Sequence, residues 1–258
     1  MAMTSPRDDD VHMLPPEVIA HRGNAAEFPE NTREALASAI QLGARFVEFD
    51  VHLAADGIPV VTHDANLARC AGVDANVFDL PARILAQYAV GEPARFGSRF
   101  HNARLPLLAD IVDLLQAHPG VRAFVELKRA SLERHGRARM LDAVAQVLRP
   151  VIDRCVFISF DIQTVRMADA DGLACGGVLR AYDEGEIADY ARIAPRYLFC
   201  DVDKLPAAPA MLQPGPWQWA IYEVADAALA HALAARGAAL VETMAVAALL
   251  AGLAAASR

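Results

Sequence analysis

The sequence predicts an α/β fold, arranged as a single (β/α)8 TIM-type barrel with an inserted subdomain after the third strand region. Short apolar runs alternate with longer segments of helical periodicity along nearly the whole chain, as expected of parallel strands joined by helices. The length of 258 residues suits one large α/β domain better than two small ones. Hydrophobic residues make up 55% of the chain, which is enough to bury a sizeable core. No internal repeat or linker divides the sequence.

Nine apolar runs are predicted to be strands: Val18–Ala20, Arg45–His52, Ile58–Thr62, Val121–Leu127, Cys155–Ser159, Cys175–Leu179, Tyr197–Val202, Trp217–Tyr222 and Ala239–Glu242. Seven segments are predicted to be helices: Thr32–Leu42, Leu107–Ala117, Gly136–Leu148, Ile162–Ala170, Glu184–Arg192, Ala225–Ala235 and Ala245–Ala255. Nine strands are one too many for an eight-stranded barrel. The second and third are joined by the turn signal Asp56-Gly57, and strands joined so tightly normally pair antiparallel. We therefore expect one of the nine, not identified from sequence, to be an irregular loop.

Two segments depart from this alternation. Residues 64–105 hold several glycines and prolines and few clear periods, so we expect an insertion, partly helical, over one end of the barrel. Insertions of this kind often shape a substrate pocket. Residues 1–14 are expected to form a disordered tail, which leaves residues 15–258 as the barrel domain.

Composition excludes several classes of protein. The net charge is −8 and no cluster of Lys and Arg offsets it, so nucleic-acid binding is not expected. No apolar run is long enough to span a bilayer and no leader-like segment begins the chain, so neither a transmembrane helix nor stable membrane association is expected. Cys70, Cys155, Cys175 and Cys200 form no C-x-x-C pair, and we interpret them as reduced thiols of a cytoplasmic protein. The oligomeric state is not indicated.

Six polar residues stand at the ends of predicted strands. Glu48 and Asp50 are two residues apart, so they face the same side of one strand, and Glu126 and Lys128 do the same on a later strand. His21 and His63 each close another strand. Because the active site of a parallel α/β barrel lies at the carboxyl ends of its strands, these side chains are expected to converge on one mouth.

The three carboxylates predict a metal site. Glu48, Asp50 and Glu126 offer oxygen ligands only, which suits one hard divalent cation, Mg²⁺ or Ca²⁺. Carboxylates grouped at a barrel mouth would otherwise repel one another. Each residue alone has a simpler explanation, since an acidic pair often marks a solvated strand end and a single histidine is often structural. Likewise, Asn31 taken alone is interpreted as the N-cap of a helix, with the Glu34 side chain contacting the start of the same helix. The prediction of a metal site rests on these residues occurring together at the ends of successive strands.

The same residues resemble a known family. The segments His21-Arg22-Gly23, Pro29-Glu30-Asn31-Thr32, Glu48-Phe49-Asp50-Val51, His63-Asp64 and Val125-Glu126-Leu127-Lys128 are similar, in order and spacing, to the motifs of the glycerophosphodiester phosphodiesterase family. The resemblance runs from about Val18 to about Met244 and is more specific in the N-terminal half.

The resemblance implies an enzyme that hydrolyses glycerophosphodiesters to glycerol 3-phosphate and an alcohol on a (β/α)8 barrel, in glycerol and lipid metabolism. It implies that His21 and His63 are the catalytic acid/base pair and that Glu48, Asp50 and Glu126 hold the metal. It further implies that Arg22 and Lys128 bind the phosphate; Trp219 is also expected to bind substrate. The expected partner is a small phosphodiester.

Three departures from the family pattern leave the substrate open. Ala54 stands in place of a Thr, Tyr222 in place of the Asn of a Trp-Thr-Val-Asn motif, and Met244 in place of an Asp. One alternative is a phosphodiesterase that acts on lysophospholipids or other lipid phosphodiesters, with Phe96, Phe100 and Trp219 as an apolar lip. The other is a barrel that binds a phosphorylated metabolite without catalysis; it would not need a pair of histidines.

Overall fold

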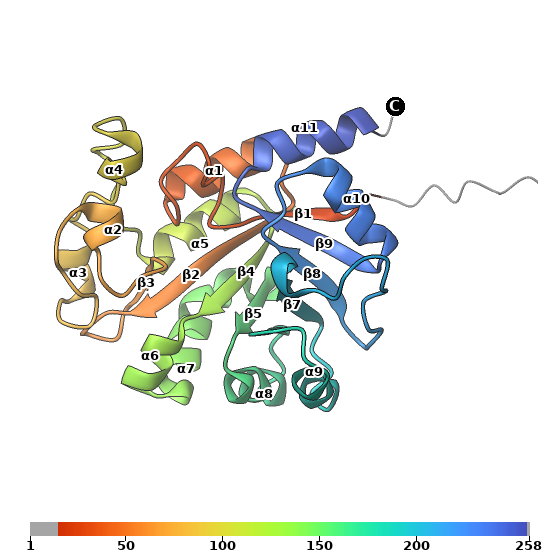
Figure 1. Cartoon of the computed structure of the whole chain (residues 1–258). Helices are drawn as coiled ribbons and strands as arrows, with labels where there is room; N and C mark the ends of the chain where they lie inside the picture. The colour runs from red at the N-terminus through yellow and green to blue at the C-terminus, as the bar shows by residue number, and fades with distance from the viewer. Residues whose placement is uncertain (1–14, 257–258) are drawn as a thin grey trace, which may run out of the picture.

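The computed structural model describes residues 15–256, so the predicted tail, residues 1–14, lies outside the described residues. A nine-stranded sheet runs in the order β1-β9-β8-β7-β6-β5-β4-β2-β3, and an additional pairing of β1 with β2 closes it into a barrel (Figure 1). Every pairing within the closed ring is parallel. The ring consists of β1 (Glu17–Ala20), β2 (Phe46–Leu53), β4 (Arg122–Leu127), β5 (Cys155–Ser159), β6 (Cys175–Val178), β7 (Tyr197–Asp201), β8 (Gln218–Tyr222) and β9 (Ala238–Thr243). The predicted TIM-type barrel is confirmed.

The extra strand is β3 (Pro59–Val61), which pairs antiparallel with β2 outside the ring. The turn between them contains Gly57 at φ +80°, a conformation that glycine adopts without strain. The expectation that one of the nine runs is an irregular loop is therefore wrong. All nine form strands, and the surplus is a hairpin rather than a loop.

Helices surround the ring and cover its outer face (Figure 1). They are α1 (Arg33–Gln41), α5 (Leu108–Ala117), α6 (Arg129–His135), α7 (Arg137–Leu148), α8 (Ile162–Ala170), α9 (Glu184–Ala191), α10 (Ala227–Ala235) and α11 (Val246–Ala256), with 3-10 turns at Arg149–Arg154 and Val202–Lys204. α6 was not predicted. The cap of α1 is Thr32, whose Oγ1 accepts a hydrogen bond from the Ala35 amide, so the interpretation of Asn31 as a helix cap is wrong.

The segment at residues 64–105 leaves the barrel after β3 and carries three short helices, α2 (Ala68–Ala71), α3 (Ala82–Leu85) and α4 (Pro93–Phe96). Its apolar residues, among them Leu67, Val77 and Leu85, form a small core together with Ala54 and Val60 of the β2–β3 hairpin. The buried Glu92 accepts a hydrogen bond from the Glu30 amide at 2.8 Å, and this contact fixes the insertion against the loop that follows β1. The insertion therefore lies beside the mouth of the barrel (Figure 1).

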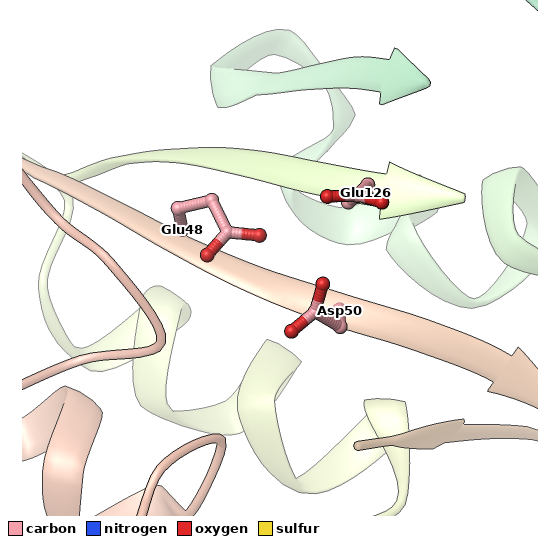
Figure 2. Close-up of side chains that lie close together, drawn as sticks. All are labelled: Glu48, Asp50 and Glu126. Carbon is pink, nitrogen blue, oxygen red and sulfur yellow. The ribbon is translucent and has the colours of Figure 1, made fainter. Parts of the chain in front are cut away.

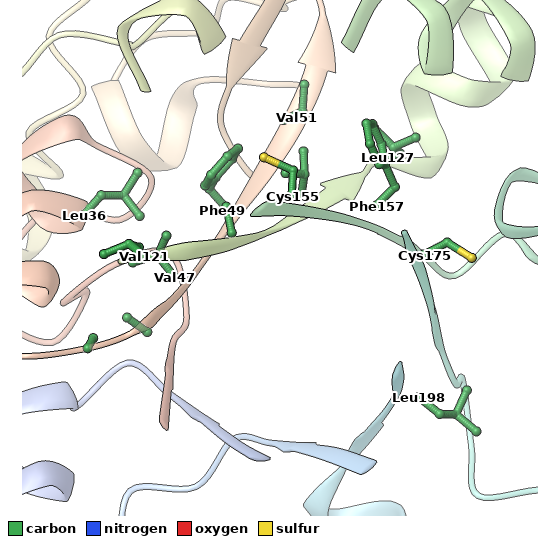
Figure 3. Close-up of a cluster of buried hydrophobic side chains, with 14 of the residues drawn as sticks. Leu36, Val47, Phe49, Val51, Val121, Leu127, Cys155, Phe157, Cys175 and Leu198 are labelled. Carbon is green, nitrogen blue, oxygen red and sulfur yellow. The ribbon is translucent and has the colours of Figure 1, made fainter. Parts of the chain in front are cut away.

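Two apolar layers support the strands. The outer layer packs strand residues such as Phe49 and Phe157 against the helices (Figure 3). The inner layer fills the barrel itself, where Phe124 packs edge-on against Tyr197 and Phe199. Each such buried aromatic side chain stabilises the fold by roughly 1.5–3 kcal/mol. Phe124 precedes Glu126 and Leu240 precedes Glu242 on the same strand faces, so the polar side chains lie nearer the carboxyl ends of the strands than this part of the apolar layer.

Two expectations about the chain as a whole can be compared with the structure. All four cysteines are free, as predicted, and all four are buried. Within residues 15–256, no helix combines the length and apolar character that crossing a bilayer requires.

Candidate active site

A cavity of about 220 Å³ opens at the carboxyl ends of the strands. Its polar lining comes from β1, β2, β3, β4, β8 and β9 or the residues that follow them, and its apolar lining from β5, β6 and β7 or the residue after β5. The lining residues are His21, Arg22, Glu48, His63, Glu126, Lys128, Ile158, Phe160, Val178, Phe199, Tyr222 and Glu242. The predicted convergence of strand ends on one mouth is thus found in the structure.

Three carboxylates meet at one side of this cavity. Asp50 and Glu126 are register partners on adjacent strands, and Glu48 lies two residues before Asp50 on the same face of β2. One oxygen from each carboxylate lies within 4.8 Å of the others, and Figure 2 shows them turned toward a common space. Glu48 and Asp50 are almost fully buried.

The charge on these carboxylates is incompletely compensated, and this observation tests whether a cation fits. Glu48 Oε1 is buried and has no hydrogen-bond partner within the described part of the chain. Burial, together with the negative charges of Asp50, Glu242 and Glu126, raises the pKa of Glu48 well above its usual value. A bound divalent cation would relieve both the repulsion and the missing contact, and an all-oxygen donor set suits Mg²⁺ or Ca²⁺. The residues present therefore fit such an ion.

Two basic side chains neutralise Asp50. Lys128 Nζ lies 3.1 Å from Asp50 Oδ1 and 2.9 Å from Glu126 Oε1, and Arg22 Nε lies 3.2 Å from Asp50 Oδ2. Burial raises the pKa of Asp50, but Lys128 and Arg22 outweigh this effect and hold the pKa below its usual range. These contacts favour the ionised form of Asp50, which holding a cation would require.

Asn31 belongs to this site. Its backbone has a φ of +57°, which turns its side chain toward β2. The side-chain amide donates to Asp50 Oδ2 at 2.7 Å, and its oxygen accepts a hydrogen bond from the Asp50 backbone amide at 3.0 Å. Asn31 thus fixes the orientation of the Asp50 carboxylate, a role that the sequence pattern did not indicate.

His21 is held by a carboxylate at its Nδ1 atom. Glu223, the residue after β8, places Oε2 2.7 Å from His21 Nδ1, while its Oε1 accepts a hydrogen bond from the Met244 amide. With Nδ1 occupied in this way, Nε2 is the ring nitrogen left for chemistry; it lies 3.9 Å from Glu48 Oε2. Burial lowers the pKa of His21, but Glu242 and Glu223 outweigh burial and raise it.

His63 is held in the same manner. Its Nδ1 lies 2.6 Å from Asp64 Oδ1, and Asp64 Oδ2 in turn accepts a hydrogen bond from Arg69. Arg69 also contacts Glu30, which pairs with Arg22. Both histidines therefore have a carboxylate at Nδ1, the arrangement that fixes the tautomer of an imidazole.

One predicted site residue lies elsewhere. Trp219 is buried in the outer core, where its ring stacks on Tyr182 and its Nε1 donates to the Gln213 carbonyl. Side chains alternate along β8, so Ala220 and Tyr222 face the barrel interior and Trp219 faces the helices. Trp219 therefore lies outside the cavity lining, contrary to the prediction that it binds substrate. Phe96 and Phe100 contact each other within and beside α4 and do not line the cavity.

Two acidic residues of the site were missed. Glu242 lines the cavity, is 3% exposed and has no hydrogen-bond partner for Oε1 within the described residues. Glu223 orients His21 from the end of β8. A signal for Glu242 existed, because it is two residues from Leu240 on β9 and therefore faces the barrel interior.

Fold and site together define a barrel protein with two oriented imidazoles beside a candidate metal site. Residues 21–174, more than half of the chain, match the model of the glycerophosphoryl diester phosphodiesterase family. The chain belongs to this family.

Individual relatives agree with this assignment. A glycerophosphodiester phosphodiesterase of Caldanaerobacter subterraneus is 37% identical over 98 residues, which cover 38% of this chain and 40% of that protein. A mouse lysophospholipase D is 31% identical over 154 residues, 56% of this chain and 49% of that one. The chain thus spans less than half the length of either relative.

Solved structures share the fold over nearly the whole chain. An Oleispira antarctica phosphodiesterase, described in complex with the product sn-glycerol-3-phosphate, superposes with a TM-score of 0.80 at 24% identity, over 93% of this chain and 97% of that one. A glycerophosphodiester phosphodiesterase from Thermotoga maritima superposes with a TM-score of 0.69 at 21% identity, over 96% and 100% of the two chains.

Proposed function

We propose that this protein is a divalent-metal-dependent phosphodiesterase that hydrolyses glycerophosphodiesters to glycerol 3-phosphate and an alcohol. The observation that carries the proposal is the meeting of two imidazoles and three carboxylates around one cavity. A site that only binds a phosphorylated metabolite has no need of two histidines that are both oriented for proton transfer. Family membership and the product named for the Oleispira phosphodiesterase support the same substrate class.

Glu48, Asp50 and Glu126 would hold the cation. When bound, such an ion polarises a phosphoryl oxygen and offsets the charge that develops on it. Arg22 and Lys128, which line the cavity, add positive charge on the same side and would bind the remaining phosphoryl oxygens. Arg22 and Lys128 can bind the phosphate and keep their ion pairs to Asp50, because each side chain carries several N–H donors.

His21 and His63 would move the two protons of the reaction. The attacking oxygen, from water or from the substrate's own glycerol hydroxyl, forms a bond to phosphorus while the bond to the leaving alcohol breaks. One Nε2 accepts the proton of the attacking hydroxyl and the other donates a proton to the leaving oxygen. If the glycerol hydroxyl attacks first, water opens the resulting cyclic phosphate by the reverse proton transfers. Acid/base assistance of this kind is worth about 10²–10⁴-fold in rate.

A direct assay tests the proposal. Purified protein is incubated with glycerophosphocholine and either Mg²⁺ or Ca²⁺, and glycerol 3-phosphate and choline are measured. We expect both products in equal amounts, and we expect exhaustive chelation to stop their release until a cation is restored. Binding of glycerol 3-phosphate without turnover of any diester would replace this proposal with a non-catalytic binding function.

A lipid phosphodiester is the second candidate substrate. The side of the cavity opposite the carboxylates is apolar and consists of Ile158, Phe160, Val178 and Phe199, and a mouse relative bears the name lysophospholipase D. Comparing kcat/KM for glycerophosphocholine and for lysophosphatidylcholine below its critical micelle concentration separates the two. We expect the water-soluble diester to be the better substrate, because a cavity of about 220 Å³ accommodates the headgroup but not an acyl chain.

A further inference from the structure

A second cavity, of about 360 Å³, adjoins the first. The two share Glu126, Lys128 and Phe160 in their walls. The remaining walls of the second cavity are Arg129, Arg180 and Lys204. A molecule bound beside Lys128 and extending past Phe160 would therefore enter this cavity.

Basic side chains dominate the second cavity. Four of its six lining residues are Lys or Arg, against a single acid, in a chain whose net charge is −8. Arg180 forms no ion pair within residues 15–256, and its backbone amide contacts Glu186 only at 3.5 Å. The local excess of positive charge opposes the charge of the protein as a whole, so it points to an anionic ligand.

The ion pairs of Arg129 and Lys204 lie at or near the surface. Arg129 lies 3.3 Å from Glu133, one helical turn along α6, and Lys204 lies 3.4 Å from Asp201. Exposed pairs of this kind contribute little free energy. Both cations can therefore turn to a bound anion at small cost.

The cations of the second cavity lie on a different side of the barrel mouth from most of the carboxylates. They follow β4, β6 and β7, whereas the carboxylates and His21 belong to β1, β2 and β4. A substituent of a phosphodiester held at Lys128 that extends past Phe160, away from β2, would lie among these cations. Guanidinium groups present several N–H donors in a planar fork that matches the oxygens of a phosphate.

We propose that the second cavity is a subsite for a phosphate carried by the leaving alcohol, so that the preferred substrates are glycerophosphodiesters of phosphorylated alcohols. Arg180 and Lys204 are its principal contacts, and Arg129 assists them. This inference rests on the proposed phosphodiesterase activity and specifies its substrate class.

A matched pair of substrates tests the subsite. Glycerophosphoglycerol and glycerophosphoglycerol phosphate differ only by a phosphate on the leaving glycerol. In the unaltered protein we expect kcat/KM to be about tenfold higher for the phosphorylated substrate at low salt, as two exposed cation–phosphate pairs would give. This preference should decline as salt is raised to about 1 M, because exposed charges are then screened. In the double variant Arg180→Gln/Lys204→Gln the ratio should fall to about one, while Arg192→Gln, a change of an exposed arginine that lines neither cavity, should preserve it.

Binding provides a readout that is independent of turnover. Calorimetry with an inactive His63→Ala variant should show the same preference for the phosphorylated diester, and the Arg180→Gln/Lys204→Gln changes in that background should remove it. Equal affinities of the two diesters, or a preference that survives the double change, would overturn the subsite. If neither diester is hydrolysed by the unaltered protein, the proposed function fails, and calorimetry alone then decides the subsite.

Discussion

Replacing Glu223 with Ala should slow catalysis without unfolding the protein. Glu223 accepts a hydrogen bond from His21 Nδ1 at 2.7 Å, and the variant loses this contact and the one to the Met244 amide. A hydrogen bond to a charged group is worth roughly 1.5–3 kcal/mol, which corresponds to ~10–150-fold in rate. Because the Glu223 side chain is 37% exposed, we expect the lower part of that range, a decrease in kcat of about 10–40-fold with KM changed less than about twofold.

The pH profile separates an orienting role from a structural one. Glu223 is among the carboxylates that raise the pKa of His21, so its removal should move the corresponding inflection of kcat/KM toward lower pH. Glu223→Gln can still accept a hydrogen bond but carries no charge, so it should recover part of kcat while keeping the lowered inflection. Glu184→Ala, which removes an exposed carboxylate in the first turn of α9, is the matched control and should change neither quantity. A Glu223→Ala variant with unchanged kcat and an unchanged pH profile would refute the reasoning.

Three further predictions concern the site and the fold. His21→Ala and His63→Ala should each lower kcat at least about 10²-fold while circular dichroism and Tm stay nearly unchanged, and normal turnover by either variant would exclude an acid/base role. Asp50→Asn should weaken Mg²⁺ or Ca²⁺ binding about tenfold or more in calorimetry, since it removes a ligand and leaves Lys128 and Arg22 beside a neutral group; unchanged metal affinity would contradict the ligand assignment. Asp161 caps α8 through the Thr164 amide and pairs with Arg137, which lowers its pKa to about 2. The stabilisation it gives is present above the unfolded pKa of about 4 and is lost as pH falls toward 2, so Asp161→Asn should cost about 1 kcal/mol of unfolding free energy at pH 7 and almost none at pH 2, measured by urea unfolding.

Local signals explain which parts of the fold were predictable. Cys155–Ser159 and Ile162–Ala170 have the predicted boundaries, because an apolar run and a capped amphipathic segment meet at Asp161. The insertion has no such periodicity in its sequence. Contacts between distant segments hold it in place, such as the hydrogen bond from the Glu30 amide to Glu92. Sequence patterns report local periodicity well and contacts between distant segments poorly.

Local periodicity likewise predicted some residues of the site and not others. Glu48, Asp50 and Glu126 were placed together because a strand fixes which side chains share a face and a barrel fixes where strand ends meet. The same parity rule, applied to β8 and β9, would have excluded Trp219 and selected Glu242. Asn31 could not be found in this way, because its role depends on a left-handed backbone conformation that only the structure shows.

Electrostatics links the missed residues to the predicted ones. Lys128 pairs with Asp50 and Glu126, and Arg22 pairs with Asp50 and Glu30, so neither cation forms an ion pair with Glu48 or Glu242 within residues 15–256. Glu48 and Glu242 each keep a buried oxygen without a hydrogen-bond donor within residues 15–256, and burial raises the pKa of both. A buried ionised carboxylate without a partner is costly in free energy. Glu48 and Glu242 would therefore be ionised together only when a cation in the cavity neutralises their charge. Glu242, absent from the predicted ligand set, adds a further buried carboxylate to this cavity; burial raises its pKa more than His21 and Arg22 lower it, and a bound cation would favour its ionised form.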